Sequence, residues 1–190
     1  MLPSILATAH ARIAEVLSEG DWAVDATLGN GHDTLFLAQH VGKTGRVVGF
    51  DVQANALVQS RRRLEAGGVA GPVTLIHAGH ETMEAHLPEE QPIQAIMFNL
   101  GYLPGSDKSC VTQAATTCTA LDAACRVLAV GGRMTVAVYT GHPGGDDEAK
   151  AVADFLQGLD QRSFQVARYG FINQRNAPPY LYLIEKLPAR

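Results

Sequence analysis

The sequence has few cysteines, no surplus of basic residues and no long apolar run, and each shortage excludes a class of protein. Its three cysteines, Cys110, Cys118 and Cys125, show no CxxC spacing, and their odd number argues against a disulfide framework. We expect them to pack as small hydrophobic side chains in the core.

Charge and hydropathy argue against two further classes of protein, general nucleic-acid binders and membrane-spanning proteins. The chain has 15 Lys and Arg against 19 Asp and Glu, so its formal charge of -4 gives no general attraction to nucleic acid. No apolar run approaches the roughly 18 residues that span a bilayer. The N-terminal stretch "MLPSILATAHARIAEVL" lacks a basic start followed by an unbroken apolar segment. We therefore expect a soluble, cytoplasmic protein whose nucleic-acid contacts, if any, are local.

The chain does contain enough apolar residues, 46% of 190, to bury one substantial core, which predicts a single domain over residues 1–190. Strands and helices alternate along it. The predicted helices cover residues 4–18, 32–41, 53–66 and 110–129 and the segment "GDDEAKAVADFLQGL". The predicted strands are "WAVDAT", "GRVVGFD", "PVTLIHA", "IQAIMFN", "RMTVAVY", "FQVARYGF" and "PYLYLIEK".

This alternation predicts a doubly wound α/β fold, with a mostly parallel seven-stranded sheet and an antiparallel pair formed by the last two strands. Ligands of such sheets bind beyond the carboxyl ends of the strands. Function is therefore expected in the loops at residues 25–33, 51–54, 78–82, 99–108 and 139–145.

The first of these loops, "DATLGNGHDT", contains Gly29 and Gly31 just before a predicted helix. Glycines allow a tight turn and close approach of a ligand, and a helix N-terminus offers N–H groups. A nucleotide or nucleoside is the expected ligand, and a plain glycine turn is the alternative. Thr34 stands where the GxGxxG pattern of dinucleotide enzymes requires a third small residue, which disfavours NAD.

Acidic residues indicate which nucleoside is bound. Asp51 ends the second strand about 20 residues beyond Gly31, where a carboxylate can accept hydrogen bonds from ribose hydroxyls; a simple helix cap is the alternative. Asp25 and Asp33 flank the glycines. Negative charge suits the ammonium and sulfonium groups of S-adenosylmethionine and would repel a pyrophosphate.

The loop "NLGYLPGSDK" indicates the chemistry. Asn99 and Tyr102 have the spacing of the [ND]PP[YF] motif of amino-directed methyltransferases, with Leu100 and Gly101 in place of the prolines. In that motif a carbonyl oxygen accepts a hydrogen bond from the target amine and the aromatic ring stacks on the substrate. The alternative is a polar loop that only closes the strand.

Taken together, "DATLGNGHDT", "GFDVQ", "FNLGYLPGSDK" and "YTGHPGG" resemble the small bacterial family labelled "putative rRNA methylase", which includes tRNA 5-(aminomethyl)-2-thiouridine methyltransferases. The resemblance extends from Ala23 to Glu185. It implies a class I methyltransferase fold, S-adenosylmethionine as cofactor, methylation of the exocyclic amine of a modified wobble uridine in the tRNA anticodon region, and a homodimer.

The predicted site has three groups of residues. The expected cofactor-binding residues are Asp25, Gly29, Asn30, Gly31, Asp33, Asp51, Gln53, His80, Glu81 and Asn99. The expected catalytic residues are Asn99, Tyr102 and His142. The expected substrate-binding residues are Tyr102, Asp107, Lys108, His142, Arg175 and Asn176.

His142 is the candidate base, because an alkyl amine is mostly protonated at neutral pH and must lose a proton before it can attack. Its alternative roles are loop packing and phosphate contact. The "RRR" at residues 61–63 is expected to be a solvated basic face rather than an RNA contact.

Other functions stay open at this point. His77, His80 and His86 have no cysteine or carboxylate pattern to complete a ligand set, so no metal site is expected. The alternative functions are an rRNA or small-molecule N-methyltransferase, an NAD-dependent oxidoreductase, and a nucleoside-binding module without catalytic activity.

Overall fold

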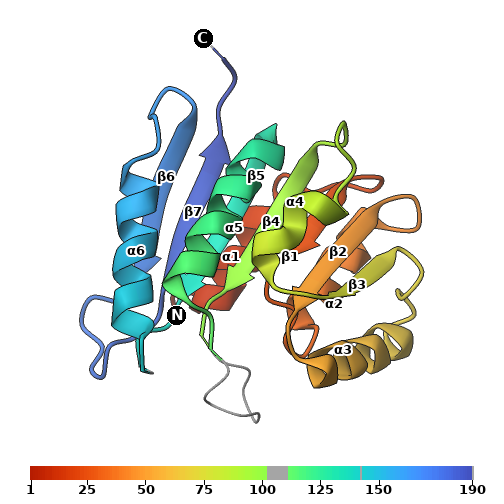
Figure 1. Cartoon of the computed structure of the whole chain (residues 1–190), viewed down its shortest axis with the longest axis horizontal. Helices are drawn as coiled ribbons and strands as arrows, with labels where there is room; N and C mark the ends of the chain where they lie inside the picture. The colour runs from red at the N-terminus through yellow and green to blue at the C-terminus, as the bar shows by residue number, and fades with distance from the viewer. Residues whose placement is uncertain (102–110, 142, 190) are drawn as a thin grey trace.

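A computed structural model describes residues 1–101, 111–141 and 143–189 and contains one seven-stranded sheet in the order β3-β2-β1-β4-β5-β7-β6 (Figure 1). The strands are β1 Trp22–Asp25, β2 Arg46–Asp51, β3 Val73–His77, β4 Ile93–Asn99, β5 Leu128–Val138, β6 Phe164–Gly170 and β7 Tyr180–Lys186. The helices are α1 Ile5–Ala14, α2 His32–Val41, α3 Ala54–Ala66, the 3-10 turn η1 His80–Thr82, α4 Met83–His86, α5 Ala114–Val127 and α6 Gly145–Gln157.

Strands β1 to β5 pair in parallel, and β7 runs antiparallel to both β5 and β6. The predicted doubly wound sheet with a terminal antiparallel pair is therefore confirmed. The chain leaves β1 toward β2 and β3 and returns to β4 on the other side of β1. This reversal of strand order places a crevice for ligands at the carboxyl ends of β1 and β4.

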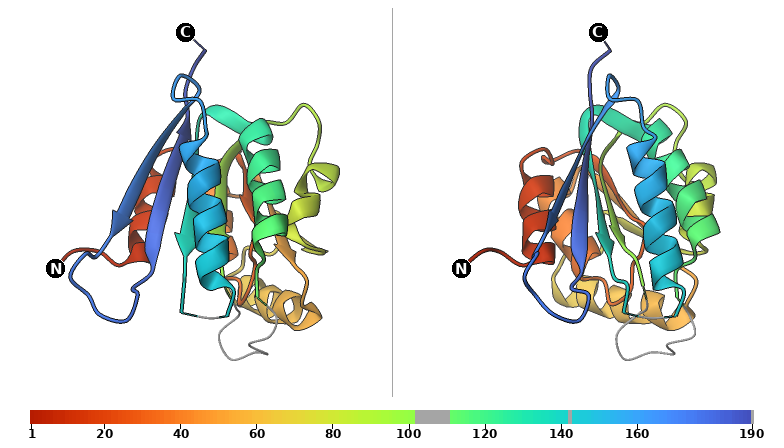
Figure 2. Two further views of the ribbon diagram at one scale, coloured as in Figure 1. Left: turned by 60° about the vertical axis from the view of Figure 1, so that its left-hand side comes forward. Right: turned by 90° about the vertical axis from the view of Figure 1, so that its left-hand side faces the viewer.

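Helices cover both faces of the sheet (Figure 2). Successive strand residues point to opposite faces, so Ile96 and Phe98 of β4 pack in the cluster that contains α5 and α6, whereas Ala95 and Met97 pack in the cluster that contains α1, α2 and α3. Because both faces are buried at the centre of the sheet, β1, β2 and β4 are mostly apolar, whereas the terminal strand β6 alternates between partly buried and exposed residues.

Several predicted boundaries were wrong. Helix α1 ends at Ala14 rather than at residue 18, and α5 covers Ala114–Val127 rather than 110–129. Strand β5 begins at Leu128, directly after α5, and its two glycines, Gly131 and Gly132, lie inside the strand at a shift in register with β4. The predicted strand "RMTVAVY" starts only at Arg133, after these glycines. η1 and α4 were missed because each is too short to show a helical period.

The cysteines agree with the prediction where the structure describes them. Cys118 and Cys125 are free thiols; Cys125 is buried in the core and Cys118 is partly buried. Burial raises the pKa of both thiols, that of Cys125 to about 11, so neither is an activated nucleophile. Cys110 lies outside the described residues.

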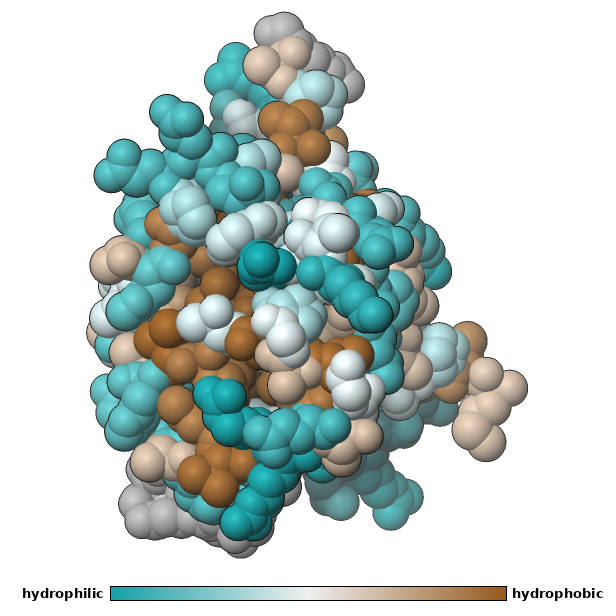
Figure 3. All heavy atoms as spheres, turned by 90° about the vertical axis from the view of Figure 1, so that its right-hand side faces the viewer, coloured by the Kyte–Doolittle hydropathy of each residue, from teal (hydrophilic) through white to brown (hydrophobic). Residues whose placement is uncertain are grey.

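Two further observations concern membrane-spanning helices and the apolar surface near β3. Within the ranges described, no helix combines the length and the apolar character needed to cross a membrane. β3 is an edge strand with Val73, Leu75 and Ile76 partly buried, and apolar surface gathers on this face of the molecule (Figure 3).

Candidate functional site

The candidate site lies where the loops after β1, β2 and β4 meet. The Thr27 hydroxyl accepts a hydrogen bond from the backbone N–H of Asn99 at 2.6 Å, which ties the end of β1 to the end of β4. The N–H of Leu28 donates to the carbonyl of Phe50 at the end of β2, at 2.9 Å. These bonds bring three of the predicted functional loops together at one edge of the sheet.

The backbone conformation of the glycine loop requires glycine at positions 29 and 31. Gly29 and Gly31 have φ of 52° and 75°, and Gly31 is the N-cap of α2. A Cβ at Gly31 would lie 2.7 to 2.9 Å from atoms of Ser60, so α3 leaves no room for a side chain there. The Ser60 hydroxyl donates to the carbonyl of Gly29 at 3.0 Å. The loop is therefore shaped by α3 as well as by its own sequence.

One prediction for the "RRR" segment was wrong. Arg61 and Arg62 are exposed, as expected for a solvated face, but Arg63 is partly buried and its Nε donates to the carbonyl of Asn30 at 2.7 Å. Arg63 thus supports the glycine loop from α3. The helix packs on the sheet, but this long side chain reaches the loop at the carboxyl edge.

Asp51 contacts both the glycine loop and the start of α3, and its predicted contact with ribose stays a prediction. Its Oδ2 accepts from the N–H of Gly29 at 2.9 Å, and its Oδ1 accepts from the N–H of Gln53, the N-cap of α3, at 2.8 Å. A carboxylate oxygen can accept more than one hydrogen bond. Asp51 therefore positions the glycine loop and keeps acceptor capacity for ribose hydroxyls.

Asp25 is fully buried beneath this loop. Its Oδ2 accepts from the Thr34 hydroxyl at 2.5 Å, and its Oδ1 accepts from the N–H of Thr27 at 3.1 Å. Burial, followed by the negative charge of Asp33, raises the pKa of Asp25 to about 7. A positive charge bound above the loop would favour the ionised form of this carboxyl.

Asp33 and Asn99 form a pair that the sequence did not predict. The Asn99 Nδ2 donates to Asp33 Oδ2, and His10 Nε2 lies 2.6 Å from Asp33 Oδ1. Asn99 Oδ1 is buried and has no hydrogen-bond partner in the described structure. His10 was missed because it lies 23 residues before Asp33, outside the loops in which function was expected.

His80 lies in the floor of the site rather than in an open wall. It is 6% exposed, and its Nδ1 is 3.2 Å from the carbonyl of Ala26. Burial lowers the pKa of His80, so the ring is a neutral donor that supports the end of β1. The Glu81 carboxylate folds back over Gly79, where a Cβ would approach within 2.2 Å of it.

A buried carboxylate, Glu148 of α6, was also missed. It is 2% exposed and accepts hydrogen bonds from the hydroxyls of Thr117 at 2.6 Å and Thr112 at 2.7 Å. The Thr112 hydroxyl accepts from the N–H of Gly101 at 2.8 Å, two residues beyond Asn99. Glu148 falls in helical phase with the buried Val152 and Leu156, and this acidic residue on an apolar face could have been noticed in the sequence.

The structure describes only some of the remaining predicted site residues. Tyr102, Asp107, Lys108 and His142 lie outside the described residues. Arg175 and Asn176 are exposed in the connection between β6 and β7, which starts from the same edge of the sheet because Tyr180 pairs with Val138 at the end of β5. Their predicted contact with substrate stays a prediction.

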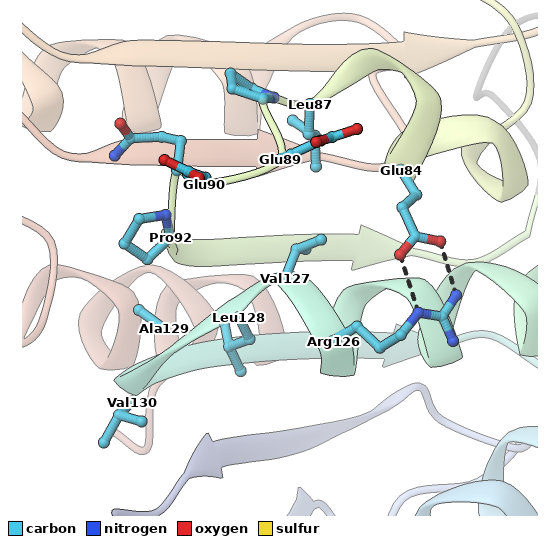
Figure 4. Close-up of a pocket in the computed structure, with 12 residues that line it drawn as sticks. Glu84, Leu87, Glu89, Glu90, Pro92, Arg126, Val127, Leu128, Ala129 and Val130 are labelled. Atoms are coloured by element: carbon cyan, nitrogen blue, oxygen red, sulfur yellow. Dashed lines mark hydrogen bonds and ion pairs between the residues drawn. The ribbon is translucent and has the colours of Figure 1, made fainter.

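A cleft of about 660 Å³ lies at the opposite end of the sheet and is not part of this site. It is lined by residues of α4 and of the segment before β4, by the end of α5 and by the start of β5, among them Glu84, Glu89, Arg126 and Val130 (Figure 4). Arg126 and Glu84 are joined there by two hydrogen bonds of 3.0 and 2.8 Å. The amino ends of parallel strands are not where ligands of this fold bind.

Charge and shape at the carboxyl edge suit a nucleoside that carries positive charge. The glycine backbone allows close approach, Asp51 has acceptor capacity for a sugar, and Asp25 and Asp33 add negative charge. The unpartnered Asn99 Oδ1 adds an acceptor for a donor that the described chain does not supply.

Comparisons with known proteins agree with this description. The family model described as "Putative rRNA methylase" matches residues 47–185. The chain is 34% identical over 186 residues to the chloroplastic tRNA (mnm(5)s(2)U34)-methyltransferase of Arabidopsis thaliana, covering 94% of this chain and 68% of that protein.

Two solved structures resemble the whole chain. A "putative rRNA-methylase" from Clostridium thermocellum has a TM-score of 0.95 and 44% identity, covering 98% of this chain and 100% of the other. A "putative methyltransferase" from Streptococcus mutans, in complex with SAH, has a TM-score of 0.90 and 42% identity, again covering 98% and 100%.

We expect Gly31→Ala to destabilise the protein more than Gly68→Ala. Both glycines have positive φ, 75° and 69°, but a Cβ at Gly68 would have no atom within 4 Å, whereas a Cβ at Gly31 would collide with Ser60. Strain alone costs about 1 kcal/mol at Gly68, and strain plus collision about 3 kcal/mol at Gly31. Denaturant unfolding measures the free energy of unfolding of each variant. Equal losses of stability in the two variants would show that α3 does not confine the loop.

We expect Glu148→Ala to lower the free energy of unfolding by about 3 kcal/mol, because it leaves the Thr112 and Thr117 hydroxyls without their charged acceptor. Asp147→Ala, one residue away and exposed, is the control and should cost about 0.5 kcal/mol or less. Chemical denaturation of the two variants gives the comparison. Similar stabilities would mean that the buried carboxylate contributes nothing.

Proposed function

The chain belongs to the "Putative rRNA methylase" family, and from this premise we propose that it methylates the aminomethyl group of 5-aminomethyl-2-thiouridine at the wobble position of tRNA. It is an S-adenosylmethionine-dependent methyltransferase with the class I fold, so the oxidoreductase alternative is set aside. The specific RNA and nucleotide are the proposed part.

The observation that carries the proposal is the unpartnered Asn99 Oδ1 at the end of β4. Leaving a buried acceptor unpaired costs about 1 to 3 kcal/mol, so a donor is expected from a ligand. An amine N–H meets this need. The name of the Arabidopsis relative supports a wobble uridine as the carrier of that amine.

We propose that the cofactor lies over the carboxyl edge between β1 and β2. Asp51 would hold the ribose hydroxyls, and the backbone of Gly29, Asn30 and Gly31 would lie against the cofactor. Asp25 and Asp33 would balance its positive charge. Gln53, His80, Glu81 and Asn99 complete the predicted set.

The cofactor supplies a methyl carbon that its sulfonium has already activated, so the residues of the chain have to align the amine, exclude water and manage its proton. Asn99 Oδ1 orients the nitrogen through a hydrogen bond. Tyr102 is proposed to stack on the nucleobase. His142 is proposed to accept the proton of the substrate ammonium, because its ordinary titration range suits this transfer.

We propose that the tRNA anticodon region contacts the carboxyl edge through Asp107, Lys108, Arg175 and Asn176. The exposure of Arg175 and Asn176 at this edge supports the proposal.

We further propose that the protein acts as a single domain in the cytoplasm and as a homodimer. Gel filtration with light scattering tests the last point, and a monomeric mass would contradict it.

An rRNA substrate is the second candidate, because the family description names rRNA. One experiment separates the two. Purified protein is incubated with labelled S-adenosylmethionine and with tRNA from cells, rRNA or small amines, and the nucleosides are then resolved by mass spectrometry. We expect 5-methylaminomethyl-2-thiouridine to form at the expense of 5-aminomethyl-2-thiouridine in tRNA. Label in rRNA alone would contradict the wobble assignment.

We expect Asp51→Ala to abolish cofactor binding and Tyr102→Ala to preserve it while turnover is lost. Asp51 holds the glycine loop and is proposed to bind the ribose, whereas Tyr102 is assigned to the substrate. Calorimetry with SAH and methyl transfer to tRNA are the two measurements. If both variants lost SAH binding equally, the division between cofactor and substrate loops would be wrong.

Affinity for S-adenosylmethionine should rise with pH as Asp25 ionises. The pKa of Asp25 is raised to about 7 in the free protein, above its ordinary value of 3.8. Because the folded protein keeps this proton where the unfolded chain has lost it, the contribution of Asp25 to the free energy of unfolding decreases as pH rises from about 4 to 7. A bound cation favours the ionised form, so binding releases a proton below pH 7. The affinity should increase about tenfold between about pH 5.5 and 7.0.

Calorimetry across this range, below the titration of an α-amino group, measures the effect. Asp25→Asn keeps the size of the side chain and removes the titration, so its affinity should depend much less on pH. An equal pH dependence in both proteins would assign the effect to another group, such as a histidine.

A further inference from the structure

We propose that His10 is a positioning residue of the methyl-transfer site: through Asp33 it holds the Asn99 amide with its carbonyl oxygen turned toward the substrate amine. This inference rests on the proposed function, since it names the residue that sets the geometry of the acceptor. His10 lies in α1, which otherwise packs over the sheet, and belongs to none of the motifs that define the site.

Three distant segments meet at Asp33. His10 from α1 contacts Oδ1 at 2.6 Å, and the Asn99 Nδ2 from the end of β4 donates to Oδ2. Asp33 stands in the first turn of α2 and its side chain is only 8% exposed. Each oxygen of this buried carboxylate therefore has a donor of its own.

The chemistry of Asp33 fixes the orientation of Asn99. An ionised carboxylate can only accept hydrogen bonds, so the group of Asn99 that faces it must be the NH₂ end of the amide. The carbonyl oxygen, Oδ1, then points the other way. This oxygen is buried and has no partner in the described part of the chain, as expected of an acceptor reserved for a ligand.

The same reasoning assigns the tautomer of His10. Because Asp33 accepts, the His10 Nε2 must carry a proton. The imidazole also stacks on Phe36 of α2, with ring centroids 4.0 Å apart and planes 1° from parallel. This stacking fixes the plane of the ring and keeps Nε2 directed at Asp33. Phe36 and Asp33 are three residues apart on α2, so one helix face presents both contacts.

Among the hydrogen bonds of the described residues, loss of the His10 donor would leave the Asp33 carboxylate held by Asn99 alone. The carboxylate could then rotate away or attract water, and the Asn99 amide would lose its single orientation. A misplaced acceptor slows methyl transfer, because a shift of about 1 Å in a reacting group can cost about 100-fold in rate. The effect is expected on kcat rather than on cofactor affinity, since His10 contacts neither Asp51 nor the glycine loop in the described hydrogen bonds.

Three variants separate positioning from packing. His10→Phe keeps a ring to stack on Phe36 but has no donor. His10→Gln restores an N–H donor at a similar distance from the backbone. His40→Gln is the matched control, because His40 also contacts Phe36, at a centroid distance of 4.3 Å, but has no contact with Asp33 among the described bonds.

We expect His10→Phe to lower kcat on tRNA about 10-fold to 100-fold, with SAH affinity and KM changed less than about twofold. His10→Gln should recover most of the rate, and His40→Gln should equal the wild type. If His10→Phe retains wild-type kcat, or if His10→Gln does not restore it, the proposal is wrong. His10→Leu replaces His10→Phe should the latter fail to fold.

A second readout needs no turnover. In NMR spectra of the free protein, the side-chain NH₂ signals of Asn99 are assigned by their absence from the Asn99→Asp variant. These signals should shift, and their hydrogens should exchange faster with water, in His10→Phe but not in His40→Gln. Unchanged Asn99 signals would contradict the proposal whatever the kinetics. Failure of the proposed function is distinct: the wild type would then leave 5-aminomethyl-2-thiouridine unmodified, while the Asn99 signals would still respond to His10.

Discussion

The pairing of β1 with β4 at the centre of the sheet is the constraint on which the site depends. The chain leaves β1 in one direction and returns to β4 from the other, so the loops after these strands turn apart and leave a crevice. The Thr27 hydroxyl bridges the two strand ends at 2.6 Å. Through this bridge, the glycine loop, proposed to face the cofactor, and the Asn99 acceptor, proposed to face the substrate, are fixed relative to each other.

Negative charge is distributed unequally over the edge of the sheet. Asp51, Asp33 and Asp25 each accept two hydrogen bonds, but Asp25 is fully buried and its pKa is raised to about 7. These environments give the three aspartates different tasks: Asp51 orders the glycine loop, Asp33 holds the Asn99 amide, and Asp25 is proposed to respond to a positive charge above it. A cationic cofactor suits this arrangement, because its charge compensates carboxylates that the fold itself neutralises only in part.

The supporting residues come from helices rather than from the loops that carry the motifs. Ser60 and Arg63 of α3 hold the glycine loop, Glu148 of α6 holds the segment after Asn99 through Thr112, and His10 of α1 holds Asp33. A loop gains a defined geometry when rigid elements pack and hydrogen-bond against it. The covering helices thus serve the site as well as the core.

The sequence by itself determined the order of strands and helices, the doubly wound sheet and the edge at which the candidate site lies, because these depend on local periodicity and on the connection rules of parallel sheets. It also indicated Gly31 and Asp51, whose roles follow from their place after a strand. It did not indicate His10, Arg63 or Glu148, nor that β5 begins directly after α5. Those side-chain roles depend on contacts between residues 23 to 36 positions apart, such as His10 with Asp33 and Glu148 with Thr112. Only the packed tertiary structure decides such contacts, because a hydrogen bond between distant side chains leaves no periodic pattern in the chain.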